Sequence, residues 1–295
     1  MQDTKTRDER LILGREVAAT IERRAATKRD ELVSTGVQPT LAVLYRGEHG
    51  DATSYRKMIK QRAGRIGIDV REVGLDGEAP QDKLIDTLRQ LDADQSVHAV
   101  LVQNPIPAHM RHAVGQALSP EKDVEGLNAT NLGKLMLDEP SVMPSTPGAI
   151  LALIESRLDT LVGKRVTIIN RSATVGRPLS QILLSKRATV TVCSTATVDL
   201  PGEARRAEVL VVAIGKPRAI GAEYIGDGAV VIDVGINADP SGQGICGDVD
   251  TEAALTRASA ITPVPGGVGP VTTAVLLENV LALAQMQQVN RAPAG

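Results

Sequence analysis

The sequence predicts an α/β protein with two domains, of which the C-terminal one is a Rossmann-like, doubly wound parallel sheet. Short β-branched runs alternate with amphipathic stretches of helical spacing, a pattern typical of parallel sheets covered by helices. The 295 residues are enough for two domains of ordinary size, each with its own core. Several of the later strands run directly into loops that contain glycine, which is where open parallel sheets bind ligands.

The first part of the chain alternates helix and strand signals. Apolar residues at helical spacing predict helices over 10–28, 55–66 and 81–92, and short apolar runs predict strands over 40–45, 69–73 and 97–102. Two prolines in 103–107 end the third strand and leave its carboxyl end open. We therefore expect a first parallel sheet with helices on its faces.

A second set of elements begins after the turn at 144–147. We expect a helix over 148–158, a strand over 165–169, a loop over 170–176, and a helix that opens at Arg177 and Pro178. Further strands are predicted over 188–192, 209–214, 229–234 and 261–264, followed by a last apolar helix over 271–284. This gives an N-terminal domain, 1–143, against which the segment 271–295 packs back, and a nucleotide-binding domain, 144–270.

Composition narrows the functional classes. The hydrophobic fraction of 42%, the charged fraction of 23% and the net charge of -2 are those of a soluble globular protein, and they give no footprint for nucleic acid or membrane. The N-terminus is charged rather than signal-like and the uninterrupted apolar runs are short, so we expect a cytoplasmic protein. The two cysteines, Cys193 and Cys246, have no partner at metal-ligand spacing, so no metal site is expected.

The loop over 170–178 is the first candidate for a ligand site. Strand, loop and helix in this order direct backbone N–H groups and the positive end of a helix toward a phosphate. The loop lacks the spacing G-x-G-x-x-G, so an ordinary turn is the alternative. Arg171 and Arg177 add cations that could meet phosphate groups, and Arg171 could hold a ribose 2′-phosphate, which favours NADP over NAD.

Three more loops follow strands in the same way. They cover 213–217, 232–237 and the segment 262–272, which is rich in proline and glycine. Glycine at such places lets a ligand approach the backbone closely. One such loop alone would be read as a turn, but several at the ends of consecutive strands predict a shared ligand crevice.

These segments resemble a known family. VGRP, AIGKP, VVIDVGIN, GDV and TPVPGGVGPVT are similar to segments of the bifunctional methylenetetrahydrofolate dehydrogenase/cyclohydrolase family, with matches from about Leu41 to Leu281. The resemblance implies a folate domain and a nucleotide domain with a tetrahydrofolate substrate in the cleft between them, NADP as cofactor, and a homodimer. It also implies oxidation of 5,10-methylenetetrahydrofolate to the methenyl form and hydrolysis of that form to 10-formyltetrahydrofolate.

The resemblance carries over to individual positions. It places Tyr55, Gln103 and Glu125 among the catalytic and substrate-binding residues, together with Pro105, Pro265, Gly266 and Gly267 at the substrate. The cofactor-binding residues that it implies are Asn170, Arg171, Ser172, Val175, Gly176, Arg177, Pro178, Ser194, Thr195, Gly215, Ile236 and Thr272.

The chain departs from the family at several of these positions. Ile59 stands at the position of the catalytic lysine, four residues after Tyr55, and Glu125 replaces an aspartate. Asn170 stands where the family usually has glycine, so a side chain lies where the backbone should approach the cofactor. Ser194 and Thr195 replace a histidine and a serine.

The substitution at position 59 separates the two reactions. Hydride transfer needs positioning more than it needs a base, whereas hydrolysis of the methenyl cation needs a polar or ionisable group to orient water and move protons. The neighbouring Lys57 and Lys60 project roughly 200° and 100° away from residue 59 on a helix. We therefore expect dehydrogenase activity with weak or absent cyclohydrolase activity.

Three alternatives for the activity and one for the cofactor stay open. The chain could be fully bifunctional through Lys57, Lys60 or a water network. It could be a non-catalytic paralogue that binds folate or nucleotide, or a dehydrogenase of another small substrate, and NAD remains an alternative to NADP.

Overall fold

The computed structural model describes residues 6–242 and 244–291 and divides the chain into two compact units. Unit 1 contains the chain up to Ala19 and the segment Thr146–Thr272, and unit 2 contains Thr20–Ser145 and the segment from Thr273 onward. This division differs from the predicted boundaries, 1–143, 144–270 and 271–295, at the N-terminus. Residues up to Ala19 belong to unit 1, together with the predicted nucleotide-binding domain.

Unit 2 is built on a three-stranded parallel sheet with the order β2-β1-β3, as the alternating pattern predicts. Its strands are β1 (Thr40–Arg46), β2 (Asp69–Leu75) and β3 (Ala99–Val102), joined through α3 (Gly50–Ile66) and α4 (Gln81–Ala93). The short helices α5 (Arg111–Ala117) and α6 (Ala129–Met136) follow β3 and were not predicted. They span only two turns each, which leaves too little periodicity to detect in the sequence.

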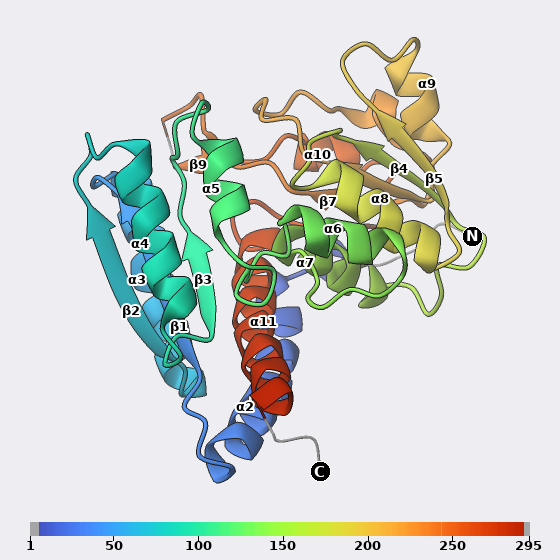
Figure 1. Ribbon diagram of the computed structural model, residues 1–295. Coiled ribbons are helices and arrows are strands. Elements are labelled where there is room, and N and C mark those ends of the chain that lie inside the picture. Colours follow the sequence, from blue (N-terminus) through green and yellow to red (C-terminus); the bar gives the residue numbers. More distant parts are fainter. Residues whose placement is uncertain (1–5, 243, 292–295) are drawn as a thin grey trace. The chain divides into compact units, whose positions relative to one another are not determined.

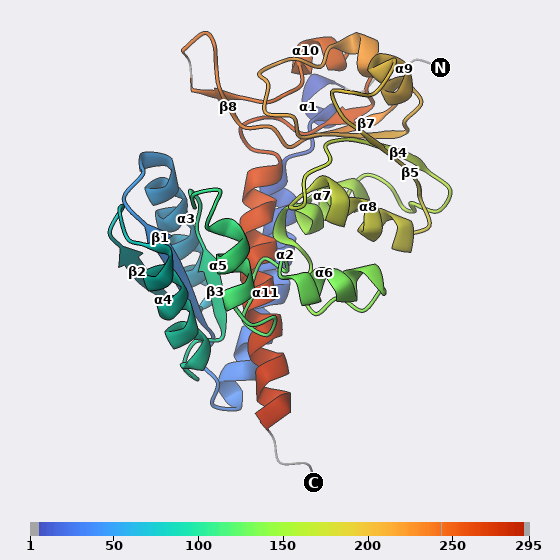
Figure 2. The ribbon, with the colours of Figure 1, turned by 45° about the horizontal axis from the view of Figure 1, so that its top comes forward.

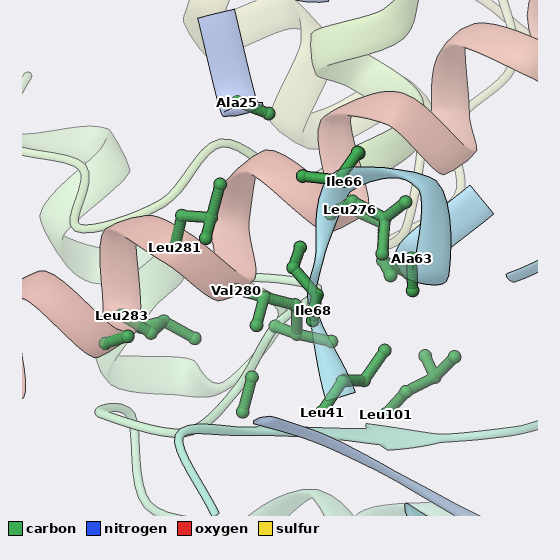
Figure 3. Close-up of a cluster of buried hydrophobic side chains, with 14 of the residues drawn as sticks. Ala25, Leu41, Ala63, Ile66, Ile68, Leu101, Leu276, Val280, Leu281 and Leu283 are labelled. Atoms are coloured by element: carbon green, nitrogen blue, oxygen red, sulfur yellow. The ribbon is translucent and has the colours of Figure 1, made fainter. Parts of the chain in front are cut away.

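Alternating side chains of β1 serve the two faces of this sheet. Leu41 and Val43 belong to a core that includes α3, and Figure 3 shows strand residues of this core facing α11 (Val268–Arg291). Ala42 and Leu44 belong to a second core, which contains residues of α4 and α5. Unit 2 therefore has helices on both faces of its sheet (Figure 1).

Unit 1 contains a five-stranded parallel sheet with the order β10-β7-β6-β4-β5. The strands are β4 (Arg165–Ile169), β5 (Thr189–Cys193), β6 (Val209–Val212), β7 (Val230–Asp233) and β10 (Ala260–Ile261). The helices α7 (Ser145–Glu155) and α8 (Gly176–Ser185) lie on one side of the sheet, and α9 (Leu200–Arg205) and α10 (Thr251–Ala254) lie on the other (Figures 1 and 2). The doubly wound sheet predicted from the sequence is confirmed.

The sequence does not predict the smaller elements of unit 1. They are the 3-10 helix η1 (Ala222–Tyr224), α9, α10 and the antiparallel pair β8 (Asn237–Ala238) and β9 (Ile245–Cys246). All of them are shorter than two helical turns or than a typical strand, so the sequence offers no period by which to recognise them.

The N-terminal segment joins unit 1 through backbone bonds. After α1 (Arg7–Arg10), Ile12 N–H donates to the carbonyl of Ile261 at 2.8 Å, beside the parallel bridge between Leu11 and Ile261. Gly14 N–H donates to the carbonyl of Gly266 at 2.8 Å at the start of α2 (Gly14–Ser34). A Cβ at residue 14 would lie 1.8 Å from the carbonyl oxygen of Gly267, so this approach requires glycine.

The helix α11 is long and apolar enough to cross a membrane by length and composition alone. Its apolar residues are interrupted by polar ones, so no long uninterrupted apolar run marks this helix in the sequence. Leu276, Leu277, Val280 and Leu281 of α11 are buried in the first core of unit 2. This burial is typical of the central helix of a globular unit.

Candidate functional site

The sheet of unit 1 reverses its strand order between β4 and β6, so this is its topological switch point. In open α/β sheets the ligand crevice lies outside the carboxyl ends of the strands at such a point. The loops at this place are 170–175 after β4 and 213–217 after β6, both of which the sequence singles out.

Asn170 connects these two loops. Its Nδ2 donates to the carbonyl of Ala213 at 2.5 Å, and its Oδ1 accepts from the N–H and hydroxyl of Ser172 at 2.9 and 2.8 Å and from the N–H of Gly176 at 2.9 Å. A Cβ on Gly176 would lie 2.1 Å from the carbonyl oxygen of Asn170, so the turn requires glycine at 176. The side chain of Asn170 thus holds the two loops together and accepts a hydrogen bond from the first residue of α8.

This arrangement differs from the expected helix-end phosphate site. The N–H of Gly176 binds Asn170, the N–H of Val175 binds the hydroxyl of Ser172 at 3.1 Å, and the N–H of Arg177 binds the carbonyl of Ser172 at 3.0 Å. The first N–H groups of α8 are therefore already paired. Ser172 accepts two of these bonds, and Asn170 accepts the one from Gly176, which a glycine at 170 would leave free.

Other donors of the loop are free for an anion. Within 6–242 and 244–291, the N–H groups of Ala173 and Thr174 have no hydrogen-bond partner. The side chains of Arg171 and Arg177 are exposed beside them. Guanidinium groups form bidentate bonds with phosphate, so the residues present fit a nucleotide through side chains and two amides rather than through the end of α8.

The loop after β6 is held by an aspartate that the sequence analysis did not select. Asp248 is fully buried, and its carboxylate accepts from the N–H groups of Ile214, Gly215 and Lys216 at 2.6, 3.0 and 2.8 Å. It also accepts from Nδ2 of Asn237 at 2.8 Å. The motif GDV contains this residue, but nothing in the sequence shows that its carboxylate gathers the backbone of a loop more than thirty residues earlier.

A second buried aspartate supports the first. Asp233, at the end of β7, accepts from the N–H groups of Gly235, Asp248 and Val249 at 3.0, 3.0 and 2.9 Å. Its own N–H donates to the hydroxyl of Thr262 at 2.8 Å, which reaches the loop after β10. Burial raises the pKa of Asp233 to about 6 although these N–H groups oppose the shift. The loops at three strand ends are thus tied together.

The remaining predicted residues of unit 1 lie on this edge of the sheet or in the turn leading to α11. Ser194 and Thr195 follow β5, whose Cys193 pairs with Ile169 of β4, and Ser194 N–H donates to the hydroxyl of Thr197 at 2.9 Å. The other positions are Pro178 inside α8, exposed Gly215 and Ile236, Pro265 after a cis peptide bond, Gly266 and Gly267, and Thr272 in the first turns of α11.

In unit 2, the charge of Glu125 acts on Tyr55. Burial raises the pKa of Tyr55 to about 12, the charge of Glu125 adds to this effect, and a hydrogen bond with Thr273 opposes it. Burial, followed by the charge of Asp123, raises the pKa of Glu125 to about 7. The Tyr55 phenol is therefore protonated at neutral pH, whereas the Glu125 carboxyl changes its protonation state there.

Glu125 faces a cavity of about 230 Å3 in unit 2. The cavity is lined by apolar side chains of β3 and α5, by Asn104 before the cis bond to exposed Pro105, and by Arg111. The carboxylate of neighbouring Asp123 already has hydrogen-bond partners, since it accepts from Asn128 N–H at 2.6 Å and from Nδ2 of Asn131 at 3.1 Å. Within the described residues Glu125 has no hydrogen-bond partner, so its carboxyl is the available acid of this region.

Ile59 lies fully buried in the core of unit 2. The neighbouring lysines do not replace it. Lys57 is exposed, and Lys60 is exposed and bound to Glu72 at 2.8 Å. The helical directions of these side chains explain the result, because residues one and two positions away from a buried residue face outward.

Gln103 is held by α3. Its N–H donates to the carbonyl of Leu44 at 2.8 Å, and its side-chain Nε2 donates to the carbonyl of Ala52 at 2.8 Å. Its Oε1 accepts from Nη1 of Arg56 at 3.1 Å. Arg56 is a residue that the sequence analysis missed, because an arginine on a helix normally faces solvent.

These features define a two-unit α/β protein. The five-stranded sheet of unit 1 has the topology and the strand-end loops of a dinucleotide-binding sheet. The comparisons with known proteins give the family. Residues 12–125 match the catalytic domain of tetrahydrofolate dehydrogenase/cyclohydrolase, and residues 144–288 match its NAD(P)-binding domain. The chain belongs to the tetrahydrofolate dehydrogenase/cyclohydrolase family, as the resemblance in sequence predicts.

Individual relatives cover nearly the whole chain. The bifunctional protein FolD of Geobacillus thermodenitrificans is 40% identical over 93% of this chain and 97% of its own length, and that of Parafrankia sp. is 42% identical over 93% and 99%. The crystal structure of the bifunctional FolD of Campylobacter jejuni superposes with a TM-score of 0.90 at 36% identity, covering 94% of this chain and 99% of its own. The Trypanosoma brucei enzyme, complexed with NADP and an inhibitor, gives 0.89 at 34%, covering 96% and 98%.

Proposed function

We propose that the chain is an NADP-dependent methylenetetrahydrofolate dehydrogenase whose cyclohydrolase step is weak or absent. The observation that carries the proposal is the burial of the apolar Ile59 in the core of unit 2. At the other positions that the resemblance implies for this unit, Tyr55, Gln103 and Glu125 have polar side chains. Family membership supplies the folate reaction, and residue 59 separates its two steps.

The donors of the loop after β4 support NADP as the cofactor. Arg171 and Arg177 are exposed, and the amides of Ala173 and Thr174 are unpaired within the described residues. The additional 2′-phosphate of NADP presents to Arg171 a negative charge that NAD lacks. The related enzyme of Trypanosoma brucei is described with NADP. When bound, the nicotinamide ring supplies the hydride acceptor.

The residues of unit 2 are suited to hold a pterin rather than to remove a proton. The hydride leaves a carbon between two nitrogens, and the nitrogen lone pairs stabilise the resulting cation without a base. Tyr55 offers a neutral, half-buried ring and phenol. Glu125, with its pKa raised to about 7, can accept from or donate to the pterin at neutral pH.

Hydrolysis of the methenyl product lacks the ionisable group that the family places at position 59. An isoleucine can neither orient water nor move a proton, Lys57 points to solvent, and Lys60 is held by Glu72. The cation that contacts Gln103 is the guanidinium of Arg56, which stays protonated and cannot act as a general base. These contacts favour a slow second step.

The test is a two-step assay with NADP and with NAD. Purified protein mixed with methylenetetrahydrofolate should form NADPH and accumulate the methenyl product, whose hydrolysis should proceed at the rate of buffer alone. Hydrolysis well above that rate would contradict the second half of the proposal and indicate a bifunctional enzyme like its relatives. Folate binding in calorimetry without reduction of either cofactor would indicate a non-catalytic binding protein.

A further inference from the structure

A buried arginine lies directly after Tyr55 on α3. The side chain of Arg56 is 4% exposed, although its neighbours Lys57 and Lys60 are exposed. A guanidinium loses much hydration free energy on burial unless paired groups replace the water. The contacts of Arg56 therefore indicate what this charge does.

The guanidinium is fixed from several directions. It stacks on the ring of Tyr45 with 3.6 Å between Cζ and the ring centroid, and its Nη2 donates to Oε2 of Glu48 at 2.5 Å. Its Nε lies 3.7 Å from Oε2 of Glu72 and makes no hydrogen bond. The remaining arm, Nη1, donates to Oε1 of Gln103 at 3.1 Å.

This contact determines the orientation of the Gln103 amide. Oε1 faces the guanidinium and Nε2 donates to the carbonyl of Ala52, so a reversed amide would place N–H groups against a cation. A primary amide has two N–H groups and two lone pairs. One N–H and one lone pair of Gln103 therefore remain for a ligand, in a direction that Arg56 sets.

The charges around the amide cancel. Arg56 and Lys60 contribute two cations, and Glu48 and Glu72 contribute two carboxylates within 4 Å of them. A dehydrogenase of methylenetetrahydrofolate forms a cationic product, which an uncompensated arginine would repel. The cluster supplies a fixed hydrogen-bond donor to Gln103 without adding net charge.

We propose that Arg56 is a positioning residue that holds the Gln103 amide for the folate substrate. This inference rests on the proposed function, since it takes Gln103 as a substrate-binding residue. Arg56 acts through Gln103 and transfers no proton, because a guanidinium does not deprotonate in proteins. A lysine at 56 would lack the planar fork that bonds Glu48 and Gln103 together.

The test compares Arg56→Met, Gln103→Met and the double variant. With the other substrate saturating in each case, we expect each single variant to raise the KM for methylenetetrahydrofolate about tenfold, which corresponds to the loss of one well-placed hydrogen bond to a ligand. The KM for NADP should change less than twofold. The double variant should be no worse than Gln103→Met, since Arg56 acts through that side chain. Arg56→Lys should recover only part of the loss. Arg65→Met, which removes an exposed arginine near the end of the same helix, is the control and should match wild type in both KM values.

Several results would overturn the inference. A lower Tm of Arg56→Met with an unchanged folate KM means that the residue is only structural. Multiplying effects in the double variant mean that the two residues act independently. If Arg56→Met does not fold, Arg56→Lys serves instead. It keeps a cation at this position but lacks the planar fork that bonds Glu48 and Gln103 together, so it should fold and raise the folate KM severalfold. An unchanged folate KM in that variant contradicts the inference.

Folate binding by calorimetry separates the two proposals. Wild type that binds and oxidises methylenetetrahydrofolate, with Arg56→Met unaffected in both, overturns only the role of Arg56. Wild type that neither binds nor oxidises it overturns the proposed function and, with it, the role of Arg56.

Discussion

Asn170 donates its side-chain amide to the carbonyl of Ala213 at 2.5 Å, and this bond joins the loops that follow β4 and β6. The two loops diverge at the switch point of the sheet, where a dinucleotide binds in doubly wound folds. The resemblance in sequence implies a glycine at this position in the family. With asparagine at 170, the N–H of Gly176 at the start of α8 is bound by a side chain of the loop and is not free for a ligand.

Two variants of Asn170 should affect the cofactor in opposite directions. Asn170→Asp keeps an acceptor for the N–H groups of Ser172 and Gly176 but adds a negative charge to the loop, so we expect the Kd for NADP to rise at least about tenfold. Asn170→Gly frees the N–H of Gly176, so we expect tighter NADP binding and a Tm several degrees lower. Calorimetric titration and thermal melts measure both effects. Weaker binding by the glycine variant would show that Asn170 shapes the loop for the cofactor.

Arg171 should set the preference for NADP over NAD. Its guanidinium is exposed beside the loop and forms no ion pair within the described chain, so it is available for a 2′-phosphate. Arg171→Gln should lower the ratio of kcat/KM for NADP to that for NAD by about tenfold or more, or about 1.4 kcal/mol. Arg177→Gln is the matched control and should affect the two cofactors equally. Equal losses with both cofactors in Arg171→Gln would assign the arginine to the shared diphosphate.

The central strands of the two sheets could be predicted from the sequence because they are buried and rich in β-branched residues. The runs at 209–214 and 229–234 contain β6 and β7, whose residues are all buried. The route of the N-terminus could not be predicted. Ile12 joins Ile261 through backbone bonds, and backbone pairing over such a separation leaves no mark in local periodicity.

The candidate site divides in the same way. Loops such as 170–178 were recognisable because they follow strands, and a strand's carboxyl end is the ligand edge of a parallel sheet. Asp248 and Arg56 were missed because their importance lies in distant partners, the amides of 214–216 and the side chain of Gln103. A buried charge looks like a surface charge in sequence until its partners are known.

Ile59 offers a direct test of the packing around α3. It is fully buried, so Ile59→Lys places an ammonium in an apolar core, and we expect it to lower the free energy of unfolding by about 3 kcal/mol or more. Ile59→Val, the control, should cost roughly 0.5–1.5 kcal/mol. Urea unfolding measures both. A lysine variant as stable as wild type would show that residue 59 can reach solvent, and a gain of methenyl hydrolysis in it would place the missing proton carrier at this position.

Glu125 should make stability depend on pH. Its folded pKa of about 7 lies above the ordinary value of 4.5, so the folded protein keeps the proton longer than the unfolded chain, and the carboxyl lowers stability progressively as pH rises from about 4.5 to about 7. Glu125→Gln stays neutral throughout. The Tm of this variant minus that of wild type should therefore grow between pH 5 and pH 7 and then level off.

The control for this experiment is Glu31→Gln, which removes an exposed carboxylate from α2 of the same unit. Its Tm difference from wild type over the same pH range is the reference against which the change in Glu125→Gln is read. A constant difference for Glu125→Gln would mean that water or a partner group solvates this carboxyl in solution. In that case the folate KM of wild type should stay unchanged between pH 5 and pH 7. If the carboxyl instead titrates near 7 beside the pterin, the folate KM should change over this range.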